Sequence, residues 1–235
     1  MITNAAEARK ALDEIAKFID ISCAPKPEPL PIDVPVIVDT AVGLQLPAAF
    51  YDHIRGDAGE LFPTMDTSQF DGIQMSLECA GGVLPLPWCA YMLATEYHET
   101  AKKMQAVREG LNVSDSWRRK NLRYYPWYGR GEVQLTWKKN YEFATKRLRE
   151  LGHEEVDLVA NPDQALEPKI STLIMLNGML EGWFTGKCLR DYIPNNPTRE
   201  HYRNARRIIN GTDRADLIAG YAMVFEQALK EGEWK

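Results

Sequence analysis

Apolar residues recur at helical spacing over most of the chain beyond residue 50, where positions i, i+3 and i+4 are repeatedly hydrophobic. This pattern predicts helices over residues 50–61, 67–79, 88–103, 140–151, 168–182, 201–209 and 215–230. One segment differs, because Val133, Leu135 and Trp137 alternate with polar residues, as in a short strand with one apolar face. We therefore predict a mainly α domain, a helical bundle with a small β-hairpin lobe.

The first 47 residues have a different pattern. Leu12, Ile15 and Ile19 share one helical face, so residues 1–22 are predicted to contain an amphipathic helix. Five prolines between positions 25 and 35 remove backbone donors, and residues 23–47 are predicted to be an extended connector. The folded domain then covers residues 48–235, and the role of the first 47 residues stays open.

Length and charge limit the classes of partner. A chain of 235 residues is long enough for one sizeable core, and its formal net charge is -5. Proteins whose main ligand is nucleic acid or an anionic membrane normally carry a basic excess, so neither partner is expected. The N-terminus lacks the apolar run of a signal peptide, and no stretch reaches the ~20 apolar residues of a membrane span. Residues 84–95, the most apolar stretch, are predicted to form a core helix.

Glu99 is the first candidate for acid–base chemistry. Pro87 stands where a helix can begin, and the apolar stripe that starts at Trp88 includes position 99. Partial removal from water favours the protonated form of a carboxyl group, which a general acid requires. On the pattern alone, Glu99 is equally well a buried glutamate that is paired with an arginine such as Arg130.

His98 and Glu99 also begin a zinc-protease motif, which needs a second histidine four residues after the first. Position 102 is Lys102, so the motif is absent. The histidines of the chain have no close pairing in sequence, and we expect neither a metal ion nor another cofactor.

A second carboxyl group is needed for most glycoside hydrolysis, in which one group protonates the departing oxygen and the other activates water or attacks the sugar. Glu109 follows Glu99 by ten positions and precedes a glycine, so it can lie on a loop across a cleft. Glu132 is the second choice. Taken alone, Glu109 is more often a solvated glutamate that pairs with Arg108.

Residues 124–131, YYPWYGRG, combine aromatic rings, an arginine and two glycines. Such a surface suits sugar rings, although the same rings can belong to the core behind a hairpin rim. The strand predicted after this segment presents Gln134 and Thr136 on its polar face, toward a ligand or water. The basic residues at 118–120 and 123 are expected to form a solvated charged loop.

Several segments together resemble glycoside hydrolase family 19. They are HET at 98–100, MQAVRE at 104–109 and YGRGEVQLTW at 128–137. The likeness continues through residues 140–141, 157–163, 182–186 and 205–211, and it covers about residues 50–229. Within the family, these segments resemble those of the phage endolysins most. Because several motifs occur in the right order, the resemblance is more specific than any one of them.

The resemblance implies a mainly α (α+β), lysozyme-like fold with the β lobe beside an active-site cleft, and an inverting hydrolase. It assigns the general acid to Glu99 and the general base to Glu109. The shorter interval between these glutamates, compared with plant chitinases, is similar to that of the endolysin branch. The positions that it implies for substrate and water binding are His98, Tyr128, Gln134, Thr136, Asn140 and Asn210.

Chitin and peptidoglycan share a β-1,4 N-acetylhexosamine backbone, so the same two glutamates can serve either polymer. The endolysin-like motifs favour the glycan strands of peptidoglycan, with chitin as the alternative. A monomeric lysin of this kind is expected to stay in the host cytoplasm until it is released to the cell wall or periplasm. A non-catalytic wall-binding module is the alternative of a different class, and the presence of Glu99, Glu109, Thr136 and Asn140 together argues against it.

Overall fold

The structure is a computed structural model that describes residues 43–56 and 61–235. Its elements are α2 (Pro47–Arg55), α3 (Thr67–Ala80), α4 (Leu86–Glu99), β1 (Val107–Arg108), α5 (Asp115–Asn121), β2 (Arg130–Gly131), α6 (Lys138–Glu150), η1 (Pro162–Leu166), α7 (Pro168–Glu181), η2 (Leu189–Asp191), α8 (Arg199–Ala205), η3 (Arg206–Ile208) and α9 (Ala215–Glu231). The two strands pair antiparallel. The prediction of a mainly α domain with a small β part is confirmed.

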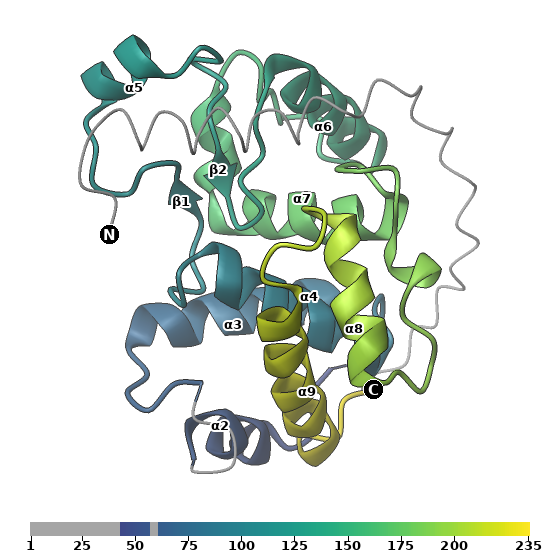
Figure 1. The fold of residues 1–235 in the computed structure, drawn as a ribbon. Helices are drawn as coiled ribbons and strands as arrows, with labels where there is room; N and C mark the ends of the chain where they lie inside the picture. Colours follow the sequence, from purple (N-terminus) through teal and green to yellow (C-terminus); the bar gives the residue numbers. More distant parts are fainter. Residues whose placement is uncertain (1–42, 57–60) are drawn as a thin grey trace.

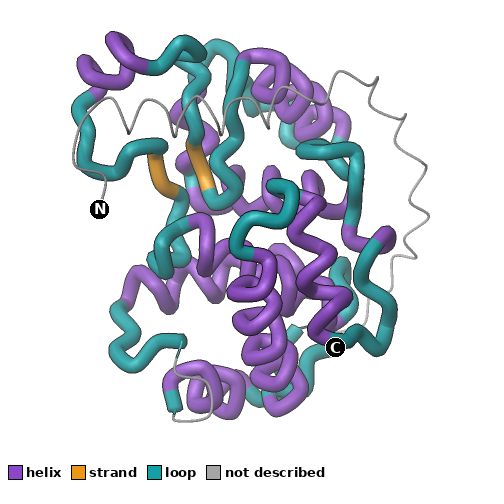
Figure 2. Tube along the Cα trace, in the orientation of Figure 1, coloured by secondary structure: helices purple, strands orange, loops and turns teal. Residues whose placement is uncertain are grey.

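Helix α4 lies at the centre of the domain. Residues 89–97 are all buried, as expected of a helix that is apolar on every side. Helix α9 packs along α4 and also contacts α2 and α8, while α3 packs on α7. In Figure 1, β1, β2, α5 and α6 lie in the upper half of the view, and α2, α3 and α9 lie in the lower half. Figure 2 shows how little of the chain is strand beside these helices.

The core helix predicted over residues 84–95 is confirmed as part of α4. The apolar side chains of α4 are buried against the neighbouring helices α9, α3 and α7. Across the described ranges, no helix combines the length and the hydropathy that crossing a membrane requires.

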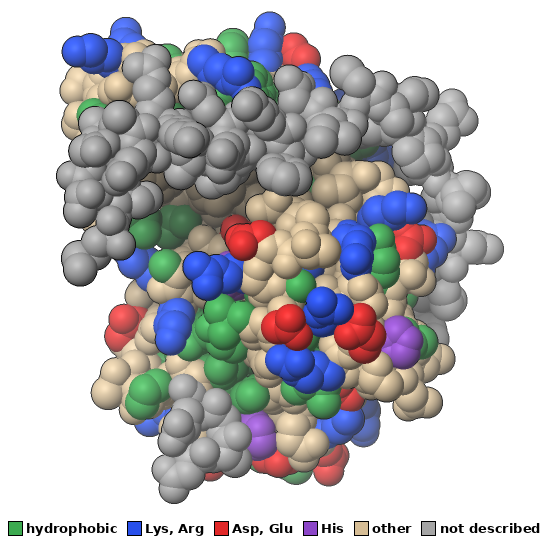
Figure 3. Space-filling view, in the orientation of Figure 1, with side chains coloured by type: hydrophobic (Ala, Val, Ile, Leu, Met, Phe, Trp, Pro, Cys, Tyr) green, Lys and Arg blue, Asp and Glu red, His purple; other side chains and the backbone are tan. Residues whose placement is uncertain are grey.

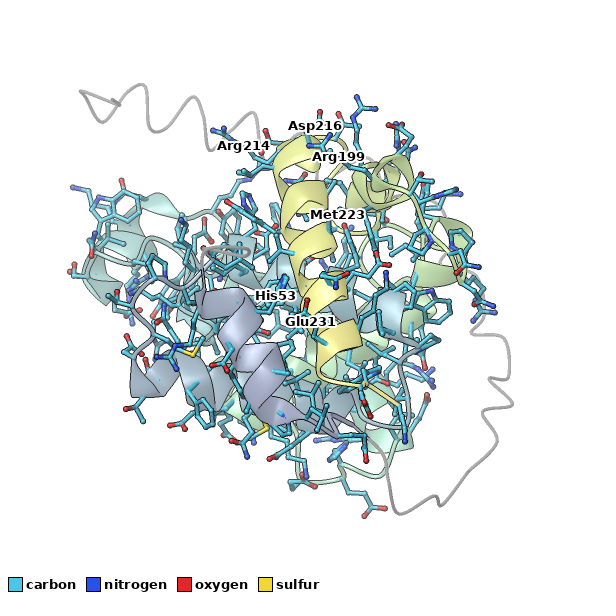
Figure 4. All side chains as sticks on the ribbon, turned by 90° about the horizontal axis from the view of Figure 1, so that it is seen from below. His53, Arg199, Arg214, Asp216, Met223 and Glu231 are labelled. Carbon is cyan, nitrogen blue, oxygen red and sulfur yellow. The ribbon has the colours of Figure 1, made fainter. Side chains whose placement is uncertain are left out.

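Ion pairs hold both ends of α9 to its neighbours, as Figure 4 shows from below. Near the end of α9, Glu231 Oε2 lies 3.0 Å from Nδ1 of His53 on α2. Near its start, Asp216 lies 3.1 Å from Arg199, at the start of α8. The Asp216–Arg199 pair is exposed on both sides and contributes little free energy, so it fixes orientation more than it adds stability.

Helix starts follow the local sequence signals. Asp66 accepts a hydrogen bond from the backbone N of Gln69 at 2.8 Å, and the Gln69 side chain accepts one from the Asp66 backbone N at 3.0 Å. This reciprocal cap satisfies two donors that a helix start leaves unpaired. Proline stands in the first turn of α2, α4 and α7, where its missing N–H costs nothing.

The strand predicted over residues 133–137 does not form. Gln134 has a φ of 53° and Trp137 a φ of 73°, so the chain turns sharply at both positions. Strand β2 stops at Gly131, and Leu135 returns to Arg130 through an isolated antiparallel bridge. The alternation in the sequence therefore reflects a tight turn with Leu135 directed into the core, where it is 5% exposed.

Helix α4 ends at Glu99, although the pattern predicted a helix to position 103. Thr100 Oγ1 donates to the carbonyl of Glu96 at 2.7 Å and accepts from the backbone N of Met104 at 3.0 Å. Ala101 and Lys102 have φ values of 52° and 70°, which a helix does not allow. The early stop places Glu99 at the end of the helix instead of in its interior.

The helix predicted in residues 1–22 and the part of the extended connector at residues 23–42 lie outside the described residues. The last residues of the connector pack on the domain. Gly43 and Lys235 exchange backbone hydrogen bonds of 3.0 and 3.2 Å, and Leu44 bridges to Trp234. The packed domain therefore begins at least five residues before position 48.

A close backbone approach makes Gly72 a test of this packing. A Cβ at Gly72 of α3 would lie 1.6 Å from the carbonyl oxygen of Met104. We predict that Gly72→Ala lowers the free energy of unfolding by about 3 kcal/mol, the upper part of the range for overpacked cores. Gly220→Ala is the matched control, because nothing lies within 4 Å of that Cβ. The control should gain about 0.5–1 kcal/mol from helix propensity. Urea unfolding of both variants measures the difference, and equal stability of the two would contradict the prediction.

Candidate active site

Glu99 sits at the C-terminal end of α4 and forms an ion pair with Arg206. Arg206 Nη1 donates to Glu99 Oε1 at 2.6 Å. The Arg206 side chain is 2% exposed and the Glu99 side chain 18% exposed. The sequence pattern offered two environments for Glu99, an apolar face or a pair with an arginine. The second applies, and the arginine is Arg206 and not Arg130.

Arg206 reaches Glu99 from the short helix η3, which follows α8 directly. Its Nε donates to the carbonyl of Asp213 at 2.9 Å, so the guanidinium joins η3, the loop before α9 and the end of α4. A buried permanent charge needs such partners, because an unpaired one costs several kcal/mol. The contact uses Oε1 of Glu99 and leaves part of the side chain accessible.

His98 is half-buried next to Glu99. Burial lowers the pKa of the imidazole, and the charges of Arg206 and Arg214 act in the same direction. The negative charges of Glu99 and Asp213 oppose that shift. Since the net pKa lies below its usual value, the ring is mainly neutral near pH 7 and can donate from one nitrogen and accept at the other.

Glu109 follows β1 directly, and its carboxylate is held by two donors. The Tyr124 hydroxyl donates to Oε1 at 2.6 Å, and the backbone N of Gly129 donates to Oε2 at 2.8 Å. The Glu109 backbone N in turn donates to the carbonyl of Gly129 at 2.7 Å. A Cβ on Gly129 would lie 2.8 Å from Gln134 Oε1, so only glycine allows this close approach. The two donors come from different residues and together fix the orientation of the Glu109 carboxyl group.

Arg118 binds the backbone of the loop that carries Glu109. It is 5% exposed, and its guanidinium donates to the carbonyls of Glu109 and Gly110, each at 2.9 Å. The basic cluster was expected to be a solvated loop. For Arg118 that expectation is wrong, because residues 115–121 form α5 and direct this side chain inward.

Tyr128 and the β strands are fixed by further arginines. Arg130 donates to Asp163 Oδ1 at 2.8 Å, and Arg108 donates to both carboxylate oxygens of Asp163 at 2.6 and 2.9 Å. The Arg130 guanidinium stands 3.6 Å from the centre of the Tyr128 ring, and the Tyr128 hydroxyl accepts from Arg108 at 3.0 Å. At 1% exposure, Tyr128 belongs to this support and offers no open ring face. The alternative in which these aromatics are core therefore describes Tyr128.

Gln134, Thr136 and Asn140 lie in consecutive turns after β2. Gln134 Nε2 donates to the carbonyls of Val107 and Gly131, both at 3.0 Å, so this side chain ties the two strands together. Thr136 Oγ1 donates to the carbonyl of Gln134 at 2.7 Å, and Asn140 Nδ2 donates to that of Thr136 at 2.7 Å. All three are half-buried, and each uses its donor on the local backbone.

Two clusters emerge from the residues predicted for the site. The first has Glu99 and His98 with Arg206, whose carbonyl accepts from the backbone N of Asn210 at 3.0 Å. The second has Glu109 with Gln134, and the turn that carries Thr136 and Asn140 follows it. Residues 100–106 connect the clusters along the chain. Figure 3 shows one face of the molecule, on which a patch of hydrophobic side chains near the centre lies beside Lys and Arg side chains.

The carboxyl group of Glu132, the second choice for the base, is directed toward α7. It is 3% exposed, and its Oε1 accepts from the hydroxyl of Thr172 at 3.0 Å. Burial raises its pKa to about 8. A base that activates water must reach solvent or substrate, so this position fits Glu132 less well than Glu109.

The sequence did not predict that Arg206, Arg118 and Tyr124 contact the two glutamates or the loop that carries Glu109. Arg206 lies within a segment that carries the family resemblance, but the pattern says nothing of its burial. An open depression of about 500 Å³ lies along α6 and the Asp157–Val159 segment, and neither Glu99 nor Glu109 lines it. In the part of the chain that the structure describes, no three His, Cys, Asp or Glu side chains are grouped as metal ligands.

No protein-family model matches the chain, and no curated protein matches it. Among solved structures, the crystal structure of chitinase C from Streptomyces griseus HUT6037 is similar at 19% sequence identity. The match covers 80% of this chain and 76% of that chain, with a TM-score of 0.46.

The Glu99–Arg206 pair makes a stability prediction. Glu99→Ala leaves the buried guanidinium without its anion and should lower the free energy of unfolding by about 2 kcal/mol, less than for a fully buried pair because Glu99 is partly exposed. Glu99→Gln keeps an acceptor for Arg206 and should lose about 1 kcal/mol or less. Urea unfolding checks both values, and a Glu99→Ala variant as stable as the wild type would show that the pair is not formed.

Proposed function

We propose that the protein is a glycoside hydrolase that cleaves β-1,4 linkages of an aminosugar polymer with inversion, using Glu99 as general acid and Glu109 as general base. The observation that carries the proposal is a pair of partly accessible glutamates, each oriented by donors from another part of the fold. Arg206 orients Glu99, whereas Tyr124 and the Gly129 backbone orient Glu109. Fixed orientation is what acid–base catalysis requires of such groups.

The environments of Glu109 and Glu99 suit different roles in acid–base catalysis. Glu109 accepts two hydrogen bonds that fix its carboxyl group, and it is assigned the base that takes a proton from water. Glu99 has to carry the proton that the departing oxygen receives. In the free protein the hydrogen bond from Arg206 occupies Oε1 of Glu99, so Arg206 must release this oxygen when the glycan is bound. The freed guanidinium can then bind a hydroxyl or carbonyl oxygen of the sugar.

An inverting mechanism places its two carboxyl groups roughly 6.5–9.5 Å apart, so that a water fits on the far face of the sugar. A glutamate at a helix end and one on a separate loop meet this condition more readily than two on adjacent helical turns, which lie about 5–6 Å apart at Cβ. In this proposal Thr136 and Asn140 orient the water, and His98, Gln134 and Asn210 contact the sugar or order the cleft. Tyr128 contributes by holding Arg108 and Arg130 behind Glu109.

Glutamine substitution separates chemistry from folding. Glu99→Gln and Glu109→Gln should each lower kcat at least 100-fold, the lower part of the range for one acid–base group. Glu142→Gln, an exposed glutamate on α6, is the matched control and should keep full activity. Release of reducing ends from the glycan is the measurement, with unfolding curves to show that the variants are folded. Near wild-type hydrolysis by Glu99→Gln would refute the acid assignment, and loss with Glu132→Gln instead of Glu109→Gln would move the base to Glu132.

The polymer is proposed to be peptidoglycan, because the motifs resemble the endolysin branch most. Digestion of purified peptidoglycan beside colloidal chitin should release fragments faster from peptidoglycan, and identification of the new reducing ends gives the bond cut. Proton NMR of early products should show the α-anomer, which inversion at a β linkage requires. Faster release from chitin would make the protein a chitinase, and binding without release from either polymer would favour the non-catalytic wall-binding module.

A further inference from the structure

Two glutamates lie in the core without a basic partner. Glu96 of α4 is 0% exposed and Glu132, just after β2, is 3% exposed. Within the described ranges neither takes part in an ion pair. Because an isolated buried carboxylate costs many kcal/mol, groups in this situation normally hold a proton.

Hydroxyl groups satisfy one oxygen of each glutamate. Ser76 Oγ, from α3, donates to Glu96 Oε2 at 2.6 Å, and Thr172 Oγ1, from α7, donates to Glu132 Oε1 at 3.0 Å. The remaining oxygens, Glu96 Oε1 and Glu132 Oε2, are buried and have no hydrogen-bond partner. Glu132 lies near enough to Glu96 for its charge to raise the pKa of Glu96, so a proton held between these two oxygens would satisfy both.

The electrostatics of the cluster agree with a retained proton. Burial raises the pKa of Glu132 to about 8, and burial followed by the charge of Glu132 raises that of Glu96 well above its usual range. Cys79 of α3 also faces the pair, and burial and both glutamates raise its thiol pKa. The charge of Lys169 lowers the pKa of Cys79, and the charge of Glu78 raises it. Cys89 is fully buried, and burial followed by the charge of Glu96 raises the pKa of its thiol.

We propose that Glu96 and Glu132 share one proton in an O–H···O hydrogen bond and that this bond joins α4 to the turn after β2. Ser76 and Thr172 fix the pair from α3 and α7, so four elements meet at it. Glu96 lies three residues before Glu99, and Glu132 lies two residues before Gln134, which ties β2 to β1 and to the Glu109 loop. The pair therefore acts as a positioning device between the two catalytic glutamates, a role that rests on the proposed function.

The sign of the pH effect follows from linkage. Unfolded glutamates lose their protons near pH ~4.3, whereas the folded pair keeps a proton to a higher pH. The folded state thus binds more protons between these limits, and stability falls as pH rises through that window. Above it, two like charges face each other across the joint, which weakens the contact between α4 and the turn.

The first test uses the wild-type chain with carbon-13-labelled glutamate. Side-chain carboxyl NMR should show a carboxyl that stays protonated at pH 7 and titrates near pH 8, and its signal should disappear in Glu132→Gln. Observation that every glutamate titrates below about pH 6 would overturn the proposal.

The second test measures unfolding at about pH 5 and about pH 8. The unfolding equilibrium constant of the wild type should rise between these conditions at least tenfold more than that of Glu96→Gln/Glu132→Gln, which keeps an amide pair but has no shared proton. Glu142→Gln should follow the wild type. Equal pH dependence in the wild type and the double variant would overturn the proposal. If the double variant does not fold, Glu132→Gln alone is compared, with a smaller difference in the same direction.

Activity tests the positioning role. The wild-type kcat should fall as pH rises toward 8, with KM changed less, and the double glutamine variant should extend activity to higher pH. An unchanged alkaline limb would show that the pair does not position the catalytic groups. If the wild type hydrolyses no glycan at any pH, the proposed function and the positioning role fail, and the NMR titration still decides whether the proton is shared.

Discussion

Arg206 places a permanent positive charge in the interior, next to the end of the most buried helix. Its side chain is almost completely removed from water, so its donors must be satisfied by the protein. The carbonyl of Asp213 and the carboxylate of Glu99 meet this need, and in doing so they connect the η3 turn, the start of α9 and the end of α4. The orientation of Glu99 thus depends on a guanidinium more than one hundred residues away in the sequence.

Buried guanidinium groups organise the second cluster in a similar way. Arg118 binds the carbonyls around Glu109, and Arg130 binds Asp163 beside the paired strands. With strands of only two residues each, the ladder alone cannot hold a loop in place. Side chains with several planar donors compensate, because one arginine can satisfy carbonyls from two turns at once. The loop that carries Glu109 is therefore as rigidly supported as a helix end.

Sequence patterns predicted the parts of this molecule that local forces determine. The Asp66–Gln69 cap and the starts of α3, α7 and α9 follow from periodicity and capping, and so these helices were found. The Val133–Trp137 alternation misled because left-handed residues inside it form a turn, which period-two spacing cannot reveal. Helix α5 has too few apolar residues for its periodicity to stand out. The roles of Arg206, Arg118 and Tyr124 depend on contacts between separate segments, so local patterns could not predict them.

The carboxyl groups of the domain lie in two kinds of environment. Glu99 and Glu109 are partly exposed, and they are held by an arginine and by two hydrogen-bond donors, respectively. Glu96 and Glu132 are buried among hydroxyl groups and a thiol, and among the described residues neither forms an ion pair. Since Glu96 is on the same helix as Glu99, one helix carries both kinds of carboxyl group less than one turn apart. A change in the protonation of the buried group therefore alters the packing at the end of α4, where the orientation of Glu99 is set.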